Sequence, residues 1–120
     1  MEAALDKKAL MPVLIDVSAM SSYTDYLGVV SGRSDRQVAA ITEGIRDAMA
    51  ARGRRVIGHE GAGNGRWMLL DYGEIVIHVF HHPVREFYDL EGLWVDAPRV
   101  KLDVPAEALL HEAETYDGAR

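Results

Sequence analysis

Residues 71–94, DYGEIVIHVFHHPVREFYDLEGLW, contain the pattern that decides the fold. They begin with a tight turn and continue into an almost wholly apolar strand over residues 75–80. A strand that is apolar on both faces is typical of the interior of a covered sheet. Aromatic and acidic side chains are then interleaved over residues 86–96. A short domain rarely buries so many rings beside so many carboxylates, so we expect part of this segment to contact a partner.

The strand at residues 75–80 has a partner immediately before it in the sequence. Residues 67–70 precede the turn, so we expect the two strands to form an antiparallel hairpin. Residues 59–66, HEGAGNGR, lead into this hairpin as a mobile glycine-rich loop. The other strands are expected at residues 13–17, 26–30 and 55–58, with a brief edge strand at residues 100–102.

The helix expected after the second strand has the strongest local signal in the chain. Ser34 and Gln37 have the spacing of a capping box, and Asp35 places a negative charge where the helix dipole favours it. Gly53 is a natural stop. With strands on either side, this helix predicts a βαβ unit with a right-handed crossover. Behind the cap, apolar residues recur at helical spacing at Val38, Ile41, Ile45, Ala48 and Met49.

These elements predict one α/β domain over residues 1–120, in which helices pack on a mixed sheet of about five strands. Its core is expected over about residues 12–103, and residues 104–120 are expected to form a C-terminal tail. Three short helices complete the pattern, at residues 2–10, at residues 84–88 after Pro83, and at residues 105–115.

Composition limits the chemistry open to the chain. Of its 120 residues, 48% are apolar and 27% are charged, which is ordinary for a globular protein. Cysteine is absent, which excludes disulfides, thiolate metal sites and cysteine nucleophiles and fits a reducing compartment. No apolar run approaches the roughly 20 residues that span a bilayer, and the first ten residues lack the pattern of a signal peptide. We therefore expect a cytoplasmic protein with no membrane partner.

The formal net charge of −6 bears on the choice of partner. A protein that holds nucleic acid through its phosphates normally carries a basic face. The lysines and arginines here are scattered, so we expect no direct sequence-specific binding of nucleic acid. An acidic surface suits a basic protein, because complementary charge speeds encounter. The alternative is that the charge only keeps the chain soluble, and composition alone favours that alternative.

Three motifs suggest chemistry, and each has a simpler structural interpretation. Residues 32–34, GRS, resemble the anion-binding turn of nucleotidyltransferases, but no pair of metal-binding carboxylates follows on a strand, so a helix cap explains them better. The glycine-rich loop lacks the GK[ST] of a P-loop. On a strand His78 faces away from His81, so these two residues and His82 do not converge on a metal. We expect no metal, no cofactor and no catalytic residue.

Four large aromatic residues lie at the entrance of the hairpin, at its turn and in the acidic segment. Any one of them alone is typical of a partly buried core. As a group they suggest an interface, because Trp and Tyr are the residues that most often anchor protein contacts. The residue pattern leaves core and interface equally open for Trp67, Tyr72, Tyr88 and Trp94.

Two long stretches resemble the ribosomal silencing factor family, also called Iojap-like. These are residues 16–45, DVSAMSSYTDYLGVVSGRSDRQVAAITEGI, and residues 67–98, WMLLDYGEIVIHVFHHPVREFYDLEGLWVDAP. The motifs S-G-x-S-D-R-Q-V, W-x-x-L-D-Y-G, V/I-H-x-F and R-x-F-Y-D-L-E-x-L-W agree in order and spacing. The resemblance covers about residues 16–98, which is most of the chain.

The resemblance implies a nucleotidyltransferase-like fold without its catalytic metal site, and therefore a protein that is not an enzyme. It implies binding to the large ribosomal subunit through the ribosomal protein L-fourteen. The bound factor blocks subunit association and represses translation in the bacterial cytoplasm. It also implies a homodimer when the protein is free. The alternative is a nucleotide-binding enzyme of the nucleotidyltransferase fold.

The contact surface of the family includes the tryptophan and the tight turn of the W-x-x-L-D-Y-G motif. This part of the surface is carried over by matching that motif to residues 67–73 of this sequence. We extend it along the acidic segment that follows. The expected partner-binding residues are therefore Trp67, Asp71, Tyr72, Gly73, Tyr88, Glu91 and Trp94.

Overall fold

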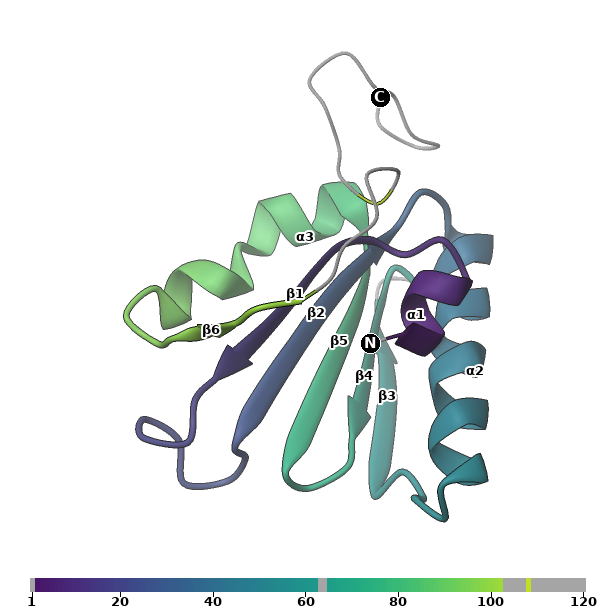
Figure 1. Ribbon diagram of the computed structural model, residues 1–120. Coiled ribbons are helices and arrows are strands. Elements are labelled where there is room, and N and C mark those ends of the chain that lie inside the picture. The colour runs from purple at the N-terminus through teal and green to yellow at the C-terminus, as the bar shows by residue number, and fades with distance from the viewer. Residues whose placement is uncertain (1, 63–64, 103–107, 109–120) are drawn as a thin grey trace.

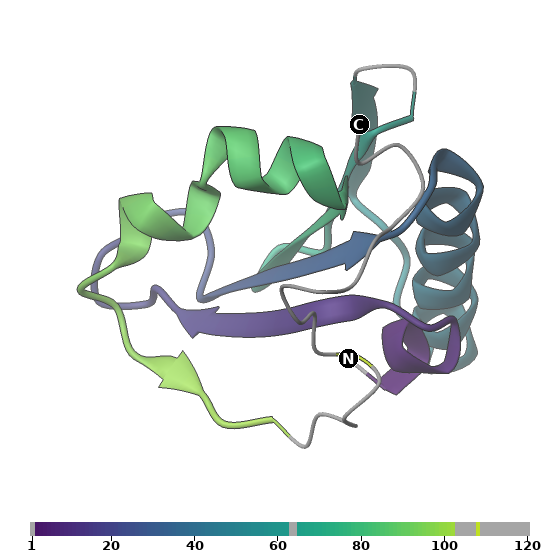
Figure 2. The same cartoon turned by 90° about the horizontal axis from the view of Figure 1, so that it is seen from above.

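The computed structural model describes residues 2–62, 65–102 and 108. Six strands form one mixed sheet in the order β3-β4-β5-β2-β1-β6, with helices on both of its faces (Figure 1, Figure 2). The predicted α/β class is confirmed, with six strands where about five were expected. The strands are β1 (Leu10–Asp16), β2 (Tyr26–Gly32), β3 (Gly58–Ala62), β4 (Trp67–Asp71), β5 (Ile75–His81) and β6 (Arg99–Val100); the helices are α1 (Glu2–Asp6), α2 (Asp35–Ala51), α3 (His82–Tyr88) and the 3-10 helix η1 (Leu90–Trp94).

Strand β5 lies inside the sheet, between β4 and β2, as its apolar sequence predicts. It pairs in parallel with β2 over seven residues, from Tyr26 opposite Ile75 to Gly32 opposite His81. Its antiparallel pairing with β4 confirms the expected hairpin. Because side chains alternate along a strand, β5 contributes residues to two separate cores, one on each face of the sheet.

Helix α2 covers one face of the sheet and has the cap that the sequence predicts. The Ser34 hydroxyl accepts a hydrogen bond from the Gln37 N–H at 3.2 Å, and the Gln37 side chain accepts one from the Arg33 N–H. The helix ends before Gly53, which has a left-handed φ of +75°. The residues of α2 buried against the sheet are Val38, Ile41, Thr42 and Ile45.

Helices α3 and η1 cover the opposite face (Figure 2). Pro83 lies in the first turn of α3, as expected. Asp89 joins the two helices in a left-handed conformation with φ +46°, so the chain turns sharply between them. Beneath them lies a core that includes Ile15, Val29 and Phe80.

The third strand was placed wrongly from the sequence. It is β3 at Gly58–Ala62, not residues 55–58, so part of the glycine-rich segment expected as a loop is strand. The backbone of β3 pairs with β4 over five residues, and a strand ladder needs no side chains. Gly61 also fits because a Cβ there would lie 2.9 Å from the Met68 sulfur atom. The need of β4 for an outer partner therefore outweighs the low strand propensity of glycine.

The ends of the chain agree with the sequence only in part, because the helix expected at residues 2–10 ends at Asp6 and β1 already begins at Leu10. Residues 2–6 are helical, and β6 is a two-residue edge strand paired with β1. The helix expected at residues 105–115 lies outside the described residues, apart from Ala108, which is buried. Among the helices of the described part, none has the length and apolar character required to cross a bilayer.

Candidate functional site

A row of aromatic rings runs from the core out to the surface of α3. The Phe80 ring is fully buried, and the Trp67 ring packs on it with ring centres 5.0 Å apart. Tyr88 also packs on Trp67, with ring centres 4.9 Å apart, and Phe87 meets Tyr88 edge-to-face at 5.1 Å. Such offset and edge-to-face pairs are favourable geometries for aromatic side chains. Strands β4 and β5 therefore fix the inner rings, which in turn support two outer rings that face solvent.

Trp67 is held in place by a hydrogen bond as well as by packing. Its indole Nε1–H donates to Nδ1 of His78 on the adjacent strand β5, at 2.9 Å. This bond requires Nδ1 of His78 to be unprotonated. Burial lowers the pKa of His78 from 6.5 to about 4, so the imidazole is neutral at physiological pH and can accept the bond. The tryptophan is therefore a fixed platform for Tyr88.

The α3–η1 segment exposes several large apolar side chains with acidic residues between them. Phe87 is 81% exposed and Leu93 is 74% exposed, which is unusual for side chains of this size. Exposed apolar groups rimmed by charge are typical of protein–protein contact sites. We refer to the following residues as the aromatic–acidic surface: Glu86, Phe87, Tyr88, Asp89, Leu93, Val95 and Asp96.

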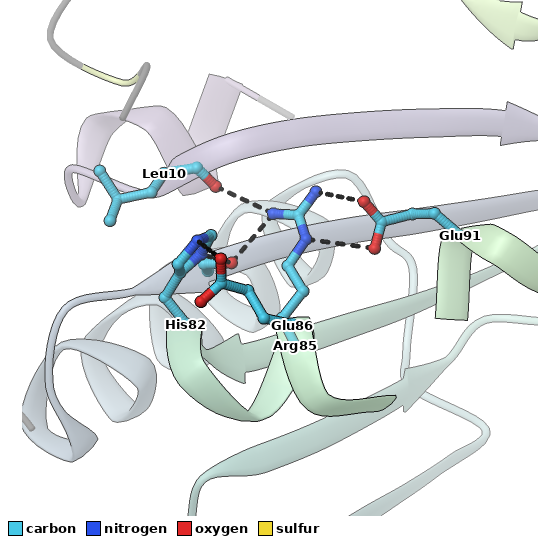
Figure 3. Close-up of polar contacts among 6 residues, drawn as sticks. Leu10, His82, Arg85, Glu86 and Glu91 are labelled. Carbon is cyan, nitrogen blue, oxygen red and sulfur yellow. Dashed lines mark hydrogen bonds and ion pairs between the residues drawn. The ribbon is translucent and has the colours of Figure 1, made fainter. Parts of the chain in front are cut away.

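A buried arginine ties this segment to the sheet (Figure 3). The Arg85 guanidinium makes a bidentate ion pair with Glu91, through Nε to Oε1 at 3.3 Å and Nη2 to Oε2 at 3.0 Å. Its third nitrogen, Nη1, donates to the Ser31 hydroxyl of β2 at 2.9 Å and to the Leu10 carbonyl of β1 at 3.5 Å. Burial raises the pKa of Glu91, but the hydrogen bonds and charge of Arg85 outweigh it and keep that pKa below its ordinary value. Helix α3, η1 and two strands thus meet at one cation.

The same cluster contains a serine, a histidine and a carboxylate that the sequence order did not reveal. Nδ1 of His82 lies 2.9 Å from the Ser31 Oγ, and Nε2 of His82 lies 4.0 Å from Glu86. The Ser31 side chain is fully buried and also accepts a hydrogen bond from Arg85. A nucleophile must reach its substrate, so this arrangement serves packing rather than acyl transfer.

The expected partner-binding residues do not form one patch. Trp67 and Tyr88 are in contact, and Glu91 and Trp94 lie on η1 on the same face of the sheet. Tyr72 belongs to the core on the opposite face, beneath α2, and is only 3% exposed. Burial raises the pKa of its phenol. A contact role for these residues stays a prediction, but the structure separates them into at least two places.

The turn residues of the W-x-x-L-D-Y-G motif have structural roles of their own. Asp71 accepts a hydrogen bond from the Gly73 N–H at 2.8 Å, and Gly73 has a left-handed φ of +89°. These residues lie at the opposite end of β4 from Trp67, because the strand is five residues long. A partner that contacts the outer rings on α3 therefore reaches this turn only if its surface is extended.

Phe87 and Leu93 belong to the segment expected to contact a partner but are not among the seven expected partner-binding residues, although they are more exposed than any of those seven. The signal that could have identified Phe87 is the helical spacing of α3. Val84 and Tyr88 lie near the sheet side, as packing against the core and Trp67 shows, so Phe87 is directed away. Which side chains of a seven-residue helix are exposed follows from the helical period, not from the alternation of aromatic and acidic residues along the sequence.

The GRS turn at residues 32–34 is occupied by the cap of α2, which agrees with its simpler interpretation. His78 contacts Trp67 on one face of the sheet and His81 lies 3.7 Å from Asp35, so the two imidazoles diverge as expected. Among the side chains that the structure describes, no group of three or more histidine and acidic residues is arranged to hold a metal ion.

Comparison with known proteins places the chain in a family. A family model described as "Ribosomal silencing factor during starvation" matches residues 1–119. The chain belongs to the ribosomal silencing factor family. It is similar to the ribosomal silencing factor RsfS of Bacillus subtilis, with 42% identity over 98 residues that cover 82% of this chain and 83% of that protein. It is also similar to the chloroplastic protein Iojap of Zea mays, with 29% identity covering 84% of this chain and 44% of that protein.

Solved structures agree with membership of the silencing factor family. A crystal structure of a Chromobacterium violaceum protein superposes with a TM-score of 0.75 and 33% identity, over 88% of this chain and 87% of that chain. A Bacillus halodurans protein gives a TM-score of 0.74 and 36% identity, over 84% and 91% of the two chains. The family model and the similar silencing factors confirm the resemblance found in the sequence motifs, and the nucleotidyltransferase alternative is not favoured.

Proposed function

We propose that the protein is a ribosomal silencing factor that binds the large ribosomal subunit through the ribosomal protein L-fourteen. The bound protein blocks association with the small subunit by its bulk and so represses translation in the bacterial cytoplasm. Membership of the ribosomal silencing factor family supports the ribosome as the target. The free protein forms a homodimer in this proposal.

The observation that carries the choice of contact surface is the exposure of Phe87 on a rigid aromatic support. Tyr88 and Trp67 connect it to the buried Phe80, so the outer rings can enter a pocket of the partner with little loss of side-chain entropy. The carboxylates around them suit a basic protein, in keeping with the net charge of −6. A stable contact needs about 800 Å² on each partner, so the aromatic–acidic surface would form its centre.

The test is co-sedimentation of purified variants with isolated large subunits. Trp67→Ala is a poor first choice, because Trp67 also packs on the core and hydrogen-bonds to His78. Phe87→Ser removes an exposed ring and leaves the core untouched. We expect binding to weaken about thirtyfold, the effect of losing a central anchor worth about 2 kcal/mol.

A matched control comes from the other end of the sheet. Tyr23 is 68% exposed and lines a polar hollow together with Gly73, so Tyr23→Ser tests the turn end of the expected surface. We expect it to bind as the unsubstituted protein does. Loss of binding in Tyr23→Ser with normal binding in Phe87→Ser would move the contact to the turn. Failure of the unsubstituted protein to sediment with large subunits, or normal subunit joining when it is bound, would overturn the function itself.

A further inference from the structure

Helices α3 and η1 are attached to the sheet in an unusual way. The only residues that α3 buries are polar, His82 and Arg85, and η1 buries none of its residues. Apolar contacts from this segment come from side chains that are partly exposed, Val84, Leu90 and Trp94. Such contacts are not directional, so they hold the segment against the sheet without fixing its angle. The directional contacts come from the hydrogen bond between His82 and Ser31 and from Arg85, and of these two residues Arg85 is the one that also pairs with η1.

Arg85 is suited to fix that angle because its guanidinium is planar and its donors point in set directions. One edge pairs with both oxygens of Glu91 on η1, and Nη1 reaches Ser31 on β2 and Leu10 on β1 (Figure 3). The guanidinium therefore defines the position of η1 relative to both strands. It does so across the left-handed turn at Asp89, where the two short helices change direction.

We propose that Arg85 is a positioning residue for partner binding, and this rests on the proposed function. The Arg85–Glu91 pair orients η1 against α3 so that the exposed rings of α3 and the exposed Leu93 of η1 are presented in a fixed relative arrangement. The guanidinium touches no partner, because it is only 4% exposed. Its role is to remove the freedom of the segment before binding, which lowers the entropy lost on association.

The experiment separates orientation from stability by a double replacement. A buried ion pair can be replaced by apolar residues of similar volume with little loss of stability, whereas removing one partner leaves a buried charge. In Arg85→Met combined with Glu91→Leu, we expect thermal stability close to that of the unsubstituted protein. We expect affinity for isolated large subunits to fall at least tenfold, because methionine and leucine have no directional contact with Ser31 or Leu10. Amide exchange in residues 90–94 should become at least tenfold faster.

Two further variants complete the series. Arg85→Lys keeps the charge but cannot pair with both Glu91 oxygens and reach Ser31 together, so we expect partial recovery of affinity over the double variant. Arg46→Met removes the cation of an exposed ion pair on α2, on the other face of the sheet, and should change neither readout. A folded double variant that binds as tightly as the unsubstituted protein, or that shows unchanged exchange in residues 90–94, would overturn the proposal.

The two hypotheses fail in different ways. If the unsubstituted protein does not sediment with large subunits, the proposed function is wrong and the positioning role for binding falls with it. If the unsubstituted protein binds and the double variant binds equally well, only the role of Arg85 is wrong.

Discussion

The two faces of the sheet are closed by different kinds of contact. On one face α2 has 17 residues, a side-chain cap and a row of buried side chains that includes Val38, Ile41 and Ile45. On the other face α3 and η1 have seven and five residues, and only His82 and Arg85 are buried. A long helix can bury enough apolar surface to hold itself in place, whereas a short one cannot. The second face therefore depends on a buried cation, and its large apolar side chains stay available for contact.

The largest expected effect comes from removing only the carboxylate of the buried Arg85–Glu91 ion pair. Glu91→Leu leaves the buried Arg85 without its carboxylate, and we expect the free energy of unfolding to fall by about 3–5 kcal/mol. Urea denaturation at neutral pH measures it. The matched control is Glu43→Leu in the exposed pair with Arg46, which should cost less than about 1 kcal/mol. Equal losses in the two variants would mean that burial of the arginine has no energetic consequence.

The face of the sheet covered by α2 is tested by Ile41→Ala. Ile41 is fully buried beneath α2, so the lost transfer energy and the cavity together should lower the free energy of unfolding by about 3 kcal/mol. Partner binding by the folded protein should be unchanged, because α2 lies on the other face from α3. The exposed residue Ala39 supplies a control, and Ala39→Ser should change stability by less than about 0.5 kcal/mol. Weakened co-sedimentation of folded Ile41→Ala would contradict the separation of the two faces.

Acid should destabilise the face of the sheet covered by α3 and η1, because His78 on that face is buried in its neutral form. The unfolded chain takes up a proton on this imidazole as the pH falls below 6.5, whereas burial keeps its pKa at about 4 in the folded protein. The contribution of His78 to the free energy of unfolding is therefore fully present above pH 6.5. It is lost as the pH falls from 6.5 to about 4, up to about 3 kcal/mol in all. The measurement is urea denaturation at pH 7 and pH 5. These conditions lie above the ordinary pKa values of the carboxyl groups.

One substitution separates the titration of His78 from that of the other ionisable groups. His78→Gln can still accept the Trp67 hydrogen bond but does not titrate, so the fall in stability between pH 7 and pH 5 should be smaller than in the unsubstituted protein. His82, whose pKa is also lowered, chiefly by burial, accounts for part of what is left. An identical fall in His78→Gln and in the unsubstituted protein would show that proton uptake occurs elsewhere.

The difference between the faces also explains what could be predicted from the sequence. The α2 side follows local rules, in which Ser34 and Gln37 set the beginning of the helix and periodic apolar residues set its buried side. Strand β5 was equally clear, because a strand apolar on both sides has to lie inside a sheet. Strand β3 was misplaced because its glycines carry no pattern, and only the unpaired edge of β4 requires a strand there.

The candidate site was harder to predict because its contacts are distant in the sequence. Trp67 and Tyr88 meet across 21 residues only because β4, β5 and α3 are packed together. Tyr72 was expected at the surface, yet the turn that follows β4 directs it under α2. Arg85 belongs to a motif of the resemblance, but a basic residue in an acidic segment gives no sign that it is buried.

The smallest expected effect concerns the junction between α3 and η1. A Cβ on Gly92 would overlap the Asp89 carboxylate, the exposed end of a side chain that can rotate away. The φ of Gly92 is not in the left-handed region, so the backbone itself accepts alanine. We expect Gly92→Ala to lower the free energy of unfolding by less than about 1 kcal/mol in urea denaturation.

The same substitution in an Asp89→Gly background shows whether that carboxylate is the cause. Asp89→Gly removes the carboxylate and also relieves the left-handed backbone of residue 89, so this change alone should raise stability slightly. Gly92→Ala should then cost nothing more, because nothing remains for the new methyl group to displace. An equal cost in both backgrounds would mean that glycine is needed at position 92 for the path of η1 itself. The polar attachment of Arg85 would then share control of the segment with the backbone at this junction.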